Sequence, residues 1–392
     1  MLLDQRAMCS SAEGQLNPEG AYSSPGNSLM NQGADFEHGW LELALVAELT
    51  PRHADSLVRR FGSPAAVLRA GSDELVAAGV SEKAATAIRD ARGRAERERR
   101  AVRGLGARIV VRGDEGYPAL LREIPDPPLA LTVRGTLAAE PCVAVVGARR
   151  ASEYGRRVAF ELGRDLARAG LTVVSGLAAG IDAAAHQGAL DGGGRTVAVL
   201  GTGIDVVYPS WHAVLAKAVA AQGALVSEFA CGTPPLPYHF PRRNRVISGV
   251  SLGTVVVEAT EDSGSLLTAQ HANEQGRAVF AVPGRLGVAV HRGPHRLIRE
   301  GARLVRGAED VLEELAPQLG PTLAERRAAA AVAGLSDAER GLLAAIECDG
   351  LHVDEVIRRA AAPAEHVLET LLALELRGLV RQLPGKRFQR AA

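Results

Sequence analysis

Three arginines, one asparagine and one phenylalanine fall within six consecutive residues of this 392-residue chain. They are Phe240, Arg242, Arg243, Asn244 and Arg245. Guanidinium groups form paired hydrogen bonds with phosphate oxygens, an asparagine amide bonds to a base edge, and a phenylalanine ring offers a surface for an unstacked base. The segment therefore indicates a site for a single nucleic-acid strand. The alternative is a solvated turn held by salt bridges.

The overall charge of the chain is balanced, with 45 Lys and Arg against 45 Asp and Glu. The molecule as a whole has no field that would attract a polyanion, so a nucleic-acid site must be a local patch whose affinity falls with salt. The four cysteines are far apart and form no CxxC pair, which argues against a disulfide framework or a zinc site and fits a reducing cytoplasm. The sequence contains no apolar run of membrane-spanning length and no secretory signal pattern, so we expect a cytoplasmic protein without a membrane partner.

Seven short, valine-rich segments alternate with stretches of helical periodicity in the middle of the chain. Their apolar residues are nearly continuous, which is typical of strands covered on both faces of a parallel sheet. The segments are Val143–Gly147, Leu171–Ser175, Thr196–Gly201, Ala224–Glu228, Gly253–Glu258, Ala278–Pro283 and Ala302–Val305. The pattern predicts an α/β fold with a Rossmann-like, doubly wound and mainly parallel sheet.

Small and polar residues follow the ends of these predicted strands, where a doubly wound sheet binds its ligands. The segment 263–268 combines backbone amides and hydroxyls at a helix start, an arrangement that suits an anion. A Pro-rich loop, 228–245, brings the arginine cluster to the same edge. The candidate nucleic-acid-binding residues are Gly147, Arg149, Ser175, Gly176, Gly180, Phe240, Arg242, Arg243, Asn244, Arg245, Ser263, Gly264, Ser265 and Thr268.

Other domains are expected on both sides of the sheet. Residues 1–38, rich in Ser, Gly, Asn and Pro, predict a disordered tail, and residues 39–103 predict a helical module. Within that module Glu74–Ala91 resembles a helix-hairpin-helix or SAM-like unit, with a plain packing module as the alternative, and the arginine-rich run 89–103 is interpreted as a solvated helix face. Residues 104–316 hold the Rossmann-like domain, 317–334 a linker, and 335–390 a winged-helix domain.

Enzymatic alternatives fit the sequence less well. Gly201 and Gly203 lack the third glycine of a dinucleotide fingerprint, and no Walker A lysine is present. Ser251 lies in a GxSxG pattern, but it precedes a predicted strand instead of following one, as a nucleophile elbow requires. His186 and His271 lack a metal-ligand partner at i+4. We therefore predict no catalytic residues, no metal and no cofactor.

Seven ordered motifs follow one another from about Tyr117 to Val311: VAVVGARRASEYG, VVSGLAAGIDAAAHQGAL, VAVLGTGIDVVYP, LVSEF, FPRRNRVISG, VVVEATEDSGSLLTAQHANEQGRAVFAVPG and LIREGA. With these motifs the chain resembles the DNA-processing protein A family, also called DprA or Smf. One departure is His295, which stands in GPHRLI where the family commonly has Asn. A winged C-terminal domain and a helical N-terminal module also match the usual layout of the family.

The resemblance implies a recombination mediator and not an enzyme. It implies that the Rossmann-like domain binds single-stranded DNA, forms a homodimer, protects incoming strands during natural transformation and loads the RecA recombinase onto them, with single-strand binding protein as a further partner. Two other functions stay open. One is a phosphoribohydrolase of the lysine-decarboxylase-like type, although SGSLLTAQH lacks the glutamate of the PGGxGTxxE pattern. The other is a scaffold with a vestigial sheet edge.

Overall fold

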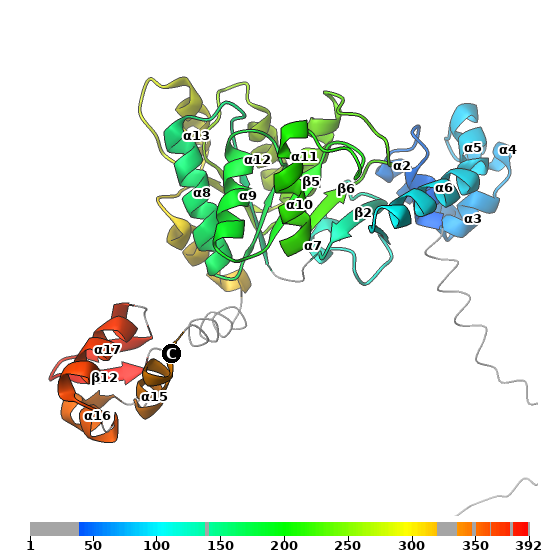
Figure 1. Cartoon of the computed structure of the whole chain (residues 1–392). Helices are drawn as coiled ribbons and strands as arrows, with labels where there is room; N and C mark the ends of the chain where they lie inside the picture. Colours follow the sequence, from blue (N-terminus) through cyan, green and yellow to red (C-terminus); the bar gives the residue numbers. More distant parts are fainter. Residues whose placement is uncertain are drawn as a thin grey trace, which may run out of the picture.

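The computed structural model describes residues 39–137, 141–319, 335–346, 350–360, 362–376 and 379–390. The predicted tail lies outside the described residues. Figure 1 shows a central sheet with helices α8 (Glu153–Arg168), α9 (Ile181–Asp191) and α10 (Ala213–Gln222) side by side in front of it. Within the described ranges, none of the helices has the length and apolarity that crossing a bilayer requires.

The central sheet has nine strands in the order β1-β2-β6-β5-β4-β3-β7-β8-β9. The seven strands from β3 to β9 run parallel to one another, which confirms the predicted Rossmann-like arrangement. Their bounds are β3 Cys142–Val146, β4 Thr172–Ser175, β5 Thr196–Leu200, β6 Ala224–Ser227, β7 Gly253–Val256, β8 Ala278–Ala281 and β9 Arg303–Leu304. Two antiparallel strands, β1 (Arg108–Val111) and β2 (Ala130–Gly135), extend the sheet beyond β6 and were not predicted.

Alternate residues of each parallel strand enter two different cores. Val143 and Val145 face α8 and α9, whereas Ala144 and Val146 face α11 (His239–Gly249) and α12 (Gly264–Glu274). Residues of α7 (Ala119–Arg122) and α13 (Ala289–Arg299) also pack on the second face. Because both faces of the sheet are covered, the strands do not alternate apolar with polar residues. This explains the nearly continuous apolar runs in the sequence.

The order of the strands reverses between β3 and β7. From β3 the chain proceeds through β4, β5 and β6 on one side, and then through β7, β8 and β9 on the other. At such a switch point the loops that follow the two central strands diverge to opposite faces and leave a crevice between them. The fold therefore places one binding crevice beyond the carboxyl ends of β3 and β7.

The N-terminal helices share their core with the edge of the sheet. Helices α2 (Pro51–Phe61), α3 (Pro64–Arg69), α4 (Ser72–Ala77), α5 (Glu82–Arg89) and α6 (Ala91–Gly104) pack around buried residues such as Leu57 and Ile88. Val111 of β1 and Leu129, next to β2, belong to the same cluster. The helical module is confirmed, together with the turn at Gly79 and the Ser81 cap, whose hydroxyl accepts from the Ala84 amide.

The C-terminal part forms its own small core. Helices α15 (Asp337–Ala345), α16 (Val353–Ala360) and α17 (Ala364–Leu376) pack against a three-stranded sheet of β10 (Leu351–His352), β12 (Arg387–Arg390) and β11 (Val380–Leu383). This is a winged-helix arrangement, as predicted. The linker was predicted from residue 317, but residues 317–319 are helical, and residues 320–334 lie outside the described residues.

His186 of α9, for which the sequence predicted no metal-ligand role, is a fully buried core residue. The hydroxyl of Thr196 donates to the Val173 carbonyl at 2.7 Å, so it accepts from His186 Nδ1 at 2.7 Å. The other ring nitrogen, Nε2, is buried and has no hydrogen-bond partner among the described residues. Burial accordingly lowers the pKa of His186 to about 3.

This histidine makes the stability depend on pH. A histidine with a lower pKa in the folded state than in the unfolded chain stabilises the fold above about pH 6.5, and this stabilisation is lost as the pH falls. When the pH falls from about 7.5 to about 5.5, we expect the contribution of His186 to the free energy of unfolding to decrease by about 1.4 kcal/mol. Urea unfolding of the wild type and of His186→Gln at both pH values measures this difference in the free energy of unfolding. An identical pH dependence in the two proteins would contradict the assignment.

Candidate nucleic-acid interface

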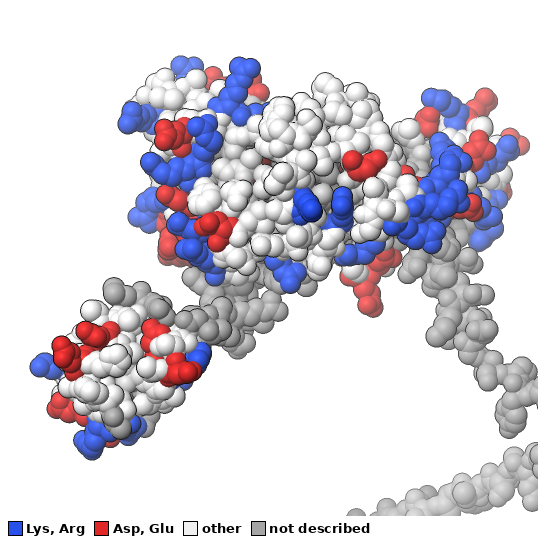
Figure 2. All heavy atoms as spheres, viewed as in Figure 1, with Lys and Arg blue, Asp and Glu red and all other residues white. Residues whose placement is uncertain are grey.

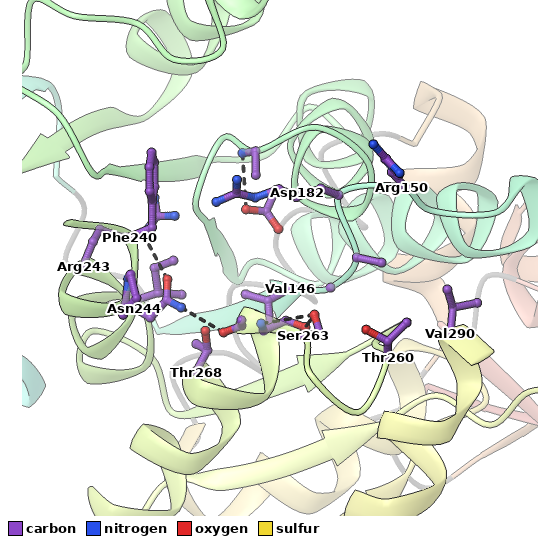
Figure 3. A pocket seen from close by; sticks show the side chains of 18 of the residues that line it. Val146, Arg150, Asp182, Phe240, Arg243, Asn244, Thr260, Ser263, Thr268 and Val290 are labelled. Carbon is purple, nitrogen blue, oxygen red and sulfur yellow. Dashed lines mark hydrogen bonds between the residues drawn. The ribbon is translucent and has the colours of Figure 1, made fainter. Parts of the chain in front are cut away.

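A crevice of about 460 Å³ lies at the switch point of the sheet. The lining residues come from the end of β3 and the segment after it, from α9, α11, α12 and α13, and from the segments that precede α9, α11 and α12. Figure 3 shows Phe240, Arg243 and Asn244 on one side, with Ser263 and Thr268 beside them. Nine of the fourteen predicted site residues line the crevice: Gly147, Arg149, Phe240, Arg243, Asn244, Ser263, Gly264, Ser265 and Thr268.

The arginine cluster lies on a helix, whereas the sequence predicted a loop. Residues His239–Gly249 form α11, with Pro241 in the first turn, where a missing amide hydrogen costs nothing. Phe240, Arg243, Asn244 and Ile247 line the crevice, and their spacing of three and four residues is that of one helix face. Helical periodicity therefore selects one of the three arginines for the crevice and directs the other two elsewhere.

Arg243 lies at the base of the crevice and is almost fully buried, with 4% of its surface exposed. Its Nη1 donates to the carbonyls of Gly176, at 2.8 Å, and Val199, and its Nε donates to Asn244 Oδ1 at 3.2 Å. Its Nη2 has no hydrogen-bond partner among the described residues, and the side chain lines the crevice. Arg243 thus fixes the architecture and faces the crevice at the same time.

The charge of Arg243 is balanced by Asp182, which also lines the crevice. Burial lowers the pKa of Arg243 to about 10, a shift that Asp182 opposes, so the guanidinium stays charged at neutral pH. Burial raises the pKa of Asp182, while Arg243 and the amides of Gly176 and Ala178 act in the opposite direction. Those two amides donate to Asp182 Oδ2 at 3.0 and 3.3 Å. Asp182 therefore shapes the loop between β4 and α9.

The N-terminus of α12 forms the wall next to α11. Ser263 caps this helix by accepting from the Ser265 amide, and the two serine hydroxyls are 2.8 Å apart. Asn244 Nδ2 donates to the Gly264 carbonyl at 3.1 Å, which ties α11 to α12. Both polar ends of the Asn244 amide are thus bound to protein, although the sequence suggested a contact with a base. The amide end of an eleven-residue helix favours an anion at this wall.

An aromatic group stands at the rim of the crevice. The Arg149 guanidinium carbon lies 5.0 Å from the ring centre of Phe240, in a cation–π contact. The ring of Tyr208 contacts the ring of Phe240, with 5.5 Å between the ring centres. Tyr208 is 43% exposed although it is a large aromatic side chain. Together these side chains offer a positive charge and two ring faces near solvent.

Ser175, Gly176 and Gly180 support the crevice from behind. The Ser175 hydroxyl donates to the Val145 carbonyl at 2.6 Å and is fully buried between strands. Gly180 has a φ of +84°, and a Cβ there would lie 2.3 Å from the Ala148 carbonyl oxygen. A side chain at Gly180 would therefore displace the backbone that carries Arg149. These residues position the site instead of lining it.

Arg242 and Arg245 project away from the crevice. Arg245 is buried and pairs with Glu228 at 2.8 Å and with Asp126 at 3.1 Å. Arg242 is half exposed and lies 3.3 Å from the same Glu228 carboxylate. Because both guanidiniums are paired with carboxylates, the structure favours a structural role for Arg242 and Arg245. This role corresponds to the salt-bridge alternative that the sequence raised.

Three crevice or rim residues were absent from the sequence prediction. Arg150 lines the crevice and is exposed, Asp182 faces Arg243, and Tyr208 contacts Phe240. The signal for Arg150 was its position directly after Arg149, and the signal for Tyr208 was an aromatic residue in the loop that follows a predicted strand. His295, the departure from the family pattern, hydrogen-bonds with the Gly284 backbone at 3.0 Å and does not line the crevice.

The described residues do not form the alternative sites considered from the sequence. Ser251 follows α11, is fully buried, and donates its hydroxyl to the Ile247 carbonyl at 2.8 Å, so it is not an exposed nucleophile. Within the described ranges, no three His, Cys, Asp or Glu side chains are grouped as metal ligands would be. Glu258, buried behind the crevice, accepts from the Ser152 amide at 2.9 Å and so supports the start of α8.

Fold and site together define a doubly wound α/β protein whose switch-point crevice is lined by arginines and a helix N-terminus and has aromatic side chains at its rim. The model of the family "DNA recombination-mediator protein A" matches residues 108–316, and that of the "DprA winged helix domain" matches residues 326–386. The chain belongs to this DprA/Smf family. It is a member of a DNA-processing family with a role related to recombination.

The similarity extends over most of the chain. Protein Smf of Escherichia coli is 44% identical over 289 residues, which cover 71% of this chain and 76% of that protein. The solved structure of DprA from Streptococcus pneumoniae aligns with a TM-score of 0.63 and 33% identity, covering 71% of this chain and 97% of the other. A structure of DNA processing protein A from Helicobacter pylori, described for its single-stranded DNA binding mode, matches with a TM-score of 0.49 and 26% identity, covering 54% of this chain and 96% of that one.

Removing the buried guanidinium should destabilise the fold. Arg243→Ala leaves Asp182 buried without its countercharge and removes the donor to two carbonyls, so we expect the free energy of unfolding to fall by about 3–5 kcal/mol. The exposed Arg149→Ala should change it by less than about 0.5 kcal/mol. Denaturant unfolding followed by circular dichroism measures both. An Arg243→Ala variant as stable as the wild type would show that the buried contacts of Arg243 do not contribute to the free energy of unfolding.

Proposed function

We propose that the crevice binds single-stranded DNA. The observation that carries this proposal is the convergence of Arg149, Arg243 and the amide end of α12 on one crevice with Phe240 at its rim. Phosphate oxygens match the guanidiniums and the helix N-terminus. The rings of Phe240 and Tyr208 match unstacked bases, which a duplex does not offer. Affinity should depend little on sequence, because any base can stack on a ring.

The proposed function is that of a recombination mediator. A protein that holds strands by their phosphates and by stacking can protect incoming DNA and present it to a recombinase. We assign it the loading of RecA onto single strands during natural transformation, in the cytoplasm and as a homodimer through the Rossmann-like domain. Single-strand binding protein is the competitor that such a mediator must displace. Family membership and the crevice chemistry support this function, in which the protein has no catalytic turnover.

Arg149 provides the test of the crevice. Because it is exposed and has no structural hydrogen bond among the described residues, Arg149→Ala should weaken the binding of all single strands alike. We expect the slope of log affinity against log salt to become shallower by about 0.7 for the lost phosphate contact. Fluorescence anisotropy with oligonucleotides of several sequences measures both. The matched control is Arg168→Ala, an exposed arginine at the other end of α8.

RecA filament nucleation tests the function as a whole. The wild-type protein should accelerate nucleation on strands coated with single-strand binding protein, and Arg149→Ala should lose most of the acceleration, whereas Arg168→Ala should retain it. A wild-type protein that binds the strand without accelerating nucleation would contradict the mediator function. Incubation with nucleoside monophosphates completes the experiment, because released base would identify a phosphoribohydrolase instead.

The winged-helix domain is proposed to contact protein and not duplex DNA. Helix α17 exposes Glu365 and Glu369 together with Leu368 and Leu372, which are 48% and 57% exposed. Acidic side chains on the helix that would enter a major groove repel phosphates, whereas a mixed acidic and apolar face suits a protein partner. Deleting residues 335–392 should therefore leave duplex affinity unchanged in a gel-shift titration. A measurable loss of duplex affinity would contradict this role.

A further inference from the structure

Helix α6 presents an arginine surface that no structural role accounts for. The side chains of Ala91, Ala95 and Val102 are buried, so the opposite side of this helix is exposed. Figure 2 shows Lys and Arg side chains gathered over the position of α6 in Figure 1. We define the α6 arginine surface by its exposed arginines, which are Arg92, Arg97, Arg100 and Arg103.

Most of these guanidiniums lack a structural partner. Arg92, Arg97 and Arg100 form no ion pair or hydrogen bond with the described residues, and the side chain of Arg103 donates to a backbone carbonyl, that of Arg99. The usual explanation for a charged helix face is a set of ion pairs three or four residues apart. In α6, however, Glu98, one of the two acidic residues of the helix, turns instead to the Cys231 amide at 2.9 Å. The face therefore keeps an excess of positive charge.

The contact of Glu98 also fixes where α6 lies. Cys231 belongs to the segment between β6 and α11, the helix that carries Phe240. Leu105, directly after α6, packs against the buried cluster that contains Ile204, and Val207, which precedes Tyr208, packs against the same cluster. Helix α6 thus adjoins the two loops that lead to the aromatic rim of the crevice. The α6 arginine surface and the crevice are neighbouring parts of the molecule.

We propose that the α6 arginine surface binds the phosphates of the strand held in the crevice, after it has crossed the aromatic rim at Tyr208 and Phe240. This inference rests on the proposed single-strand function of the crevice. Four arginines over the twelve residues from Arg92 to Arg103 extend about 16 Å along the helix, which is enough for several phosphates. A chain without net charge needs such a local surface to hold a longer polyanion.

The length of the strand separates the two sites. The full chain is titrated with oligothymidines of about 6 and about 30 nucleotides at several salt concentrations, because only the longer strand reaches beyond one small site. The variant is Arg97→Gln with Arg100→Gln, which keeps helix formers on an exposed face. The matched control is Arg168→Gln with Arg195→Gln, two exposed arginines near the amino ends of the parallel strands, opposite the crevice.

The α6 variant should bind the short strand as the wild type does. On the long strand we expect roughly 20-fold weaker binding at about 0.1 M salt and a salt slope shallower by about 1.4, while the control retains wild-type slope. An unchanged affinity and slope on the long strand overturns the inference, and so does an equal loss on both lengths. A loss confined to duplex DNA overturns it as well, because the proposed ligand is a single strand.

The proposed function fails separately from this inference. If Arg149→Ala binds the short strand as tightly as the wild type does, the crevice is not the strand site. The effect of the α6 variant on the long strand is then compared with that of Arg149→Ala. If the α6 variant still weakens binding of the long strand although Arg149→Ala does not, the strand reaches α6 without passing through the crevice. That result contradicts the path from crevice to helix that we propose.

Discussion

The buried guanidinium of Arg243 is the interaction on which the site depends. It joins α11 to the ends of two parallel strands through the carbonyls of Gly176 and Val199, and it faces the carboxylate of Asp182. Isolated charges are expensive to bury, so the pair persists because each partner is also held by hydrogen bonds. The result is a crevice with a guanidinium at its base whose position is already fixed before a ligand arrives.

Cations in this protein serve two separate purposes. Arg243 and Arg245 are buried with carboxylates and carbonyls as partners, and they hold α11 against the sheet. Arg149 and Arg150 are exposed at the mouth of the crevice. Because a guanidinium that contacts a phosphate releases counterions from the nucleic acid, we expect the second group to determine the salt dependence of strand binding, while the first holds the crevice together.

The sequence was sufficient to predict the parallel sheet. Strands covered on both faces leave uninterrupted valine-rich runs, and all seven predicted segments are strands within about two residues of their predicted ends. Strands β1 and β2 were not predicted, because four- to six-residue antiparallel strands at an edge leave too short a pattern. The winged-helix domain was also predicted from its own sequence pattern, and the family resemblance agreed with it.

The candidate site was predicted in position but not in detail. The convergence of Gly147, Arg243 and Gly264 on one crevice follows from the rule that ligands bind where strand ends meet helix starts. The different environments of Arg243 and Arg245 could not be predicted, because the Pro-rich approach to α11 suggested a loop and hid the helical spacing. The partner of Arg245, Glu228, is seventeen residues away, and a pairing over that separation leaves no local sequence signal.

Photo-crosslinking maps the strand on the protein most directly. An oligonucleotide that carries a photoreactive pyrimidine attaches to the aromatic side chain on which the base stacks, and mass spectrometry identifies the peptide. Binding of the strand in the crevice predicts adducts at Phe240 or Tyr208, both at the rim. Adducts confined to the winged-helix domain, with neither rim residue modified, would contradict it.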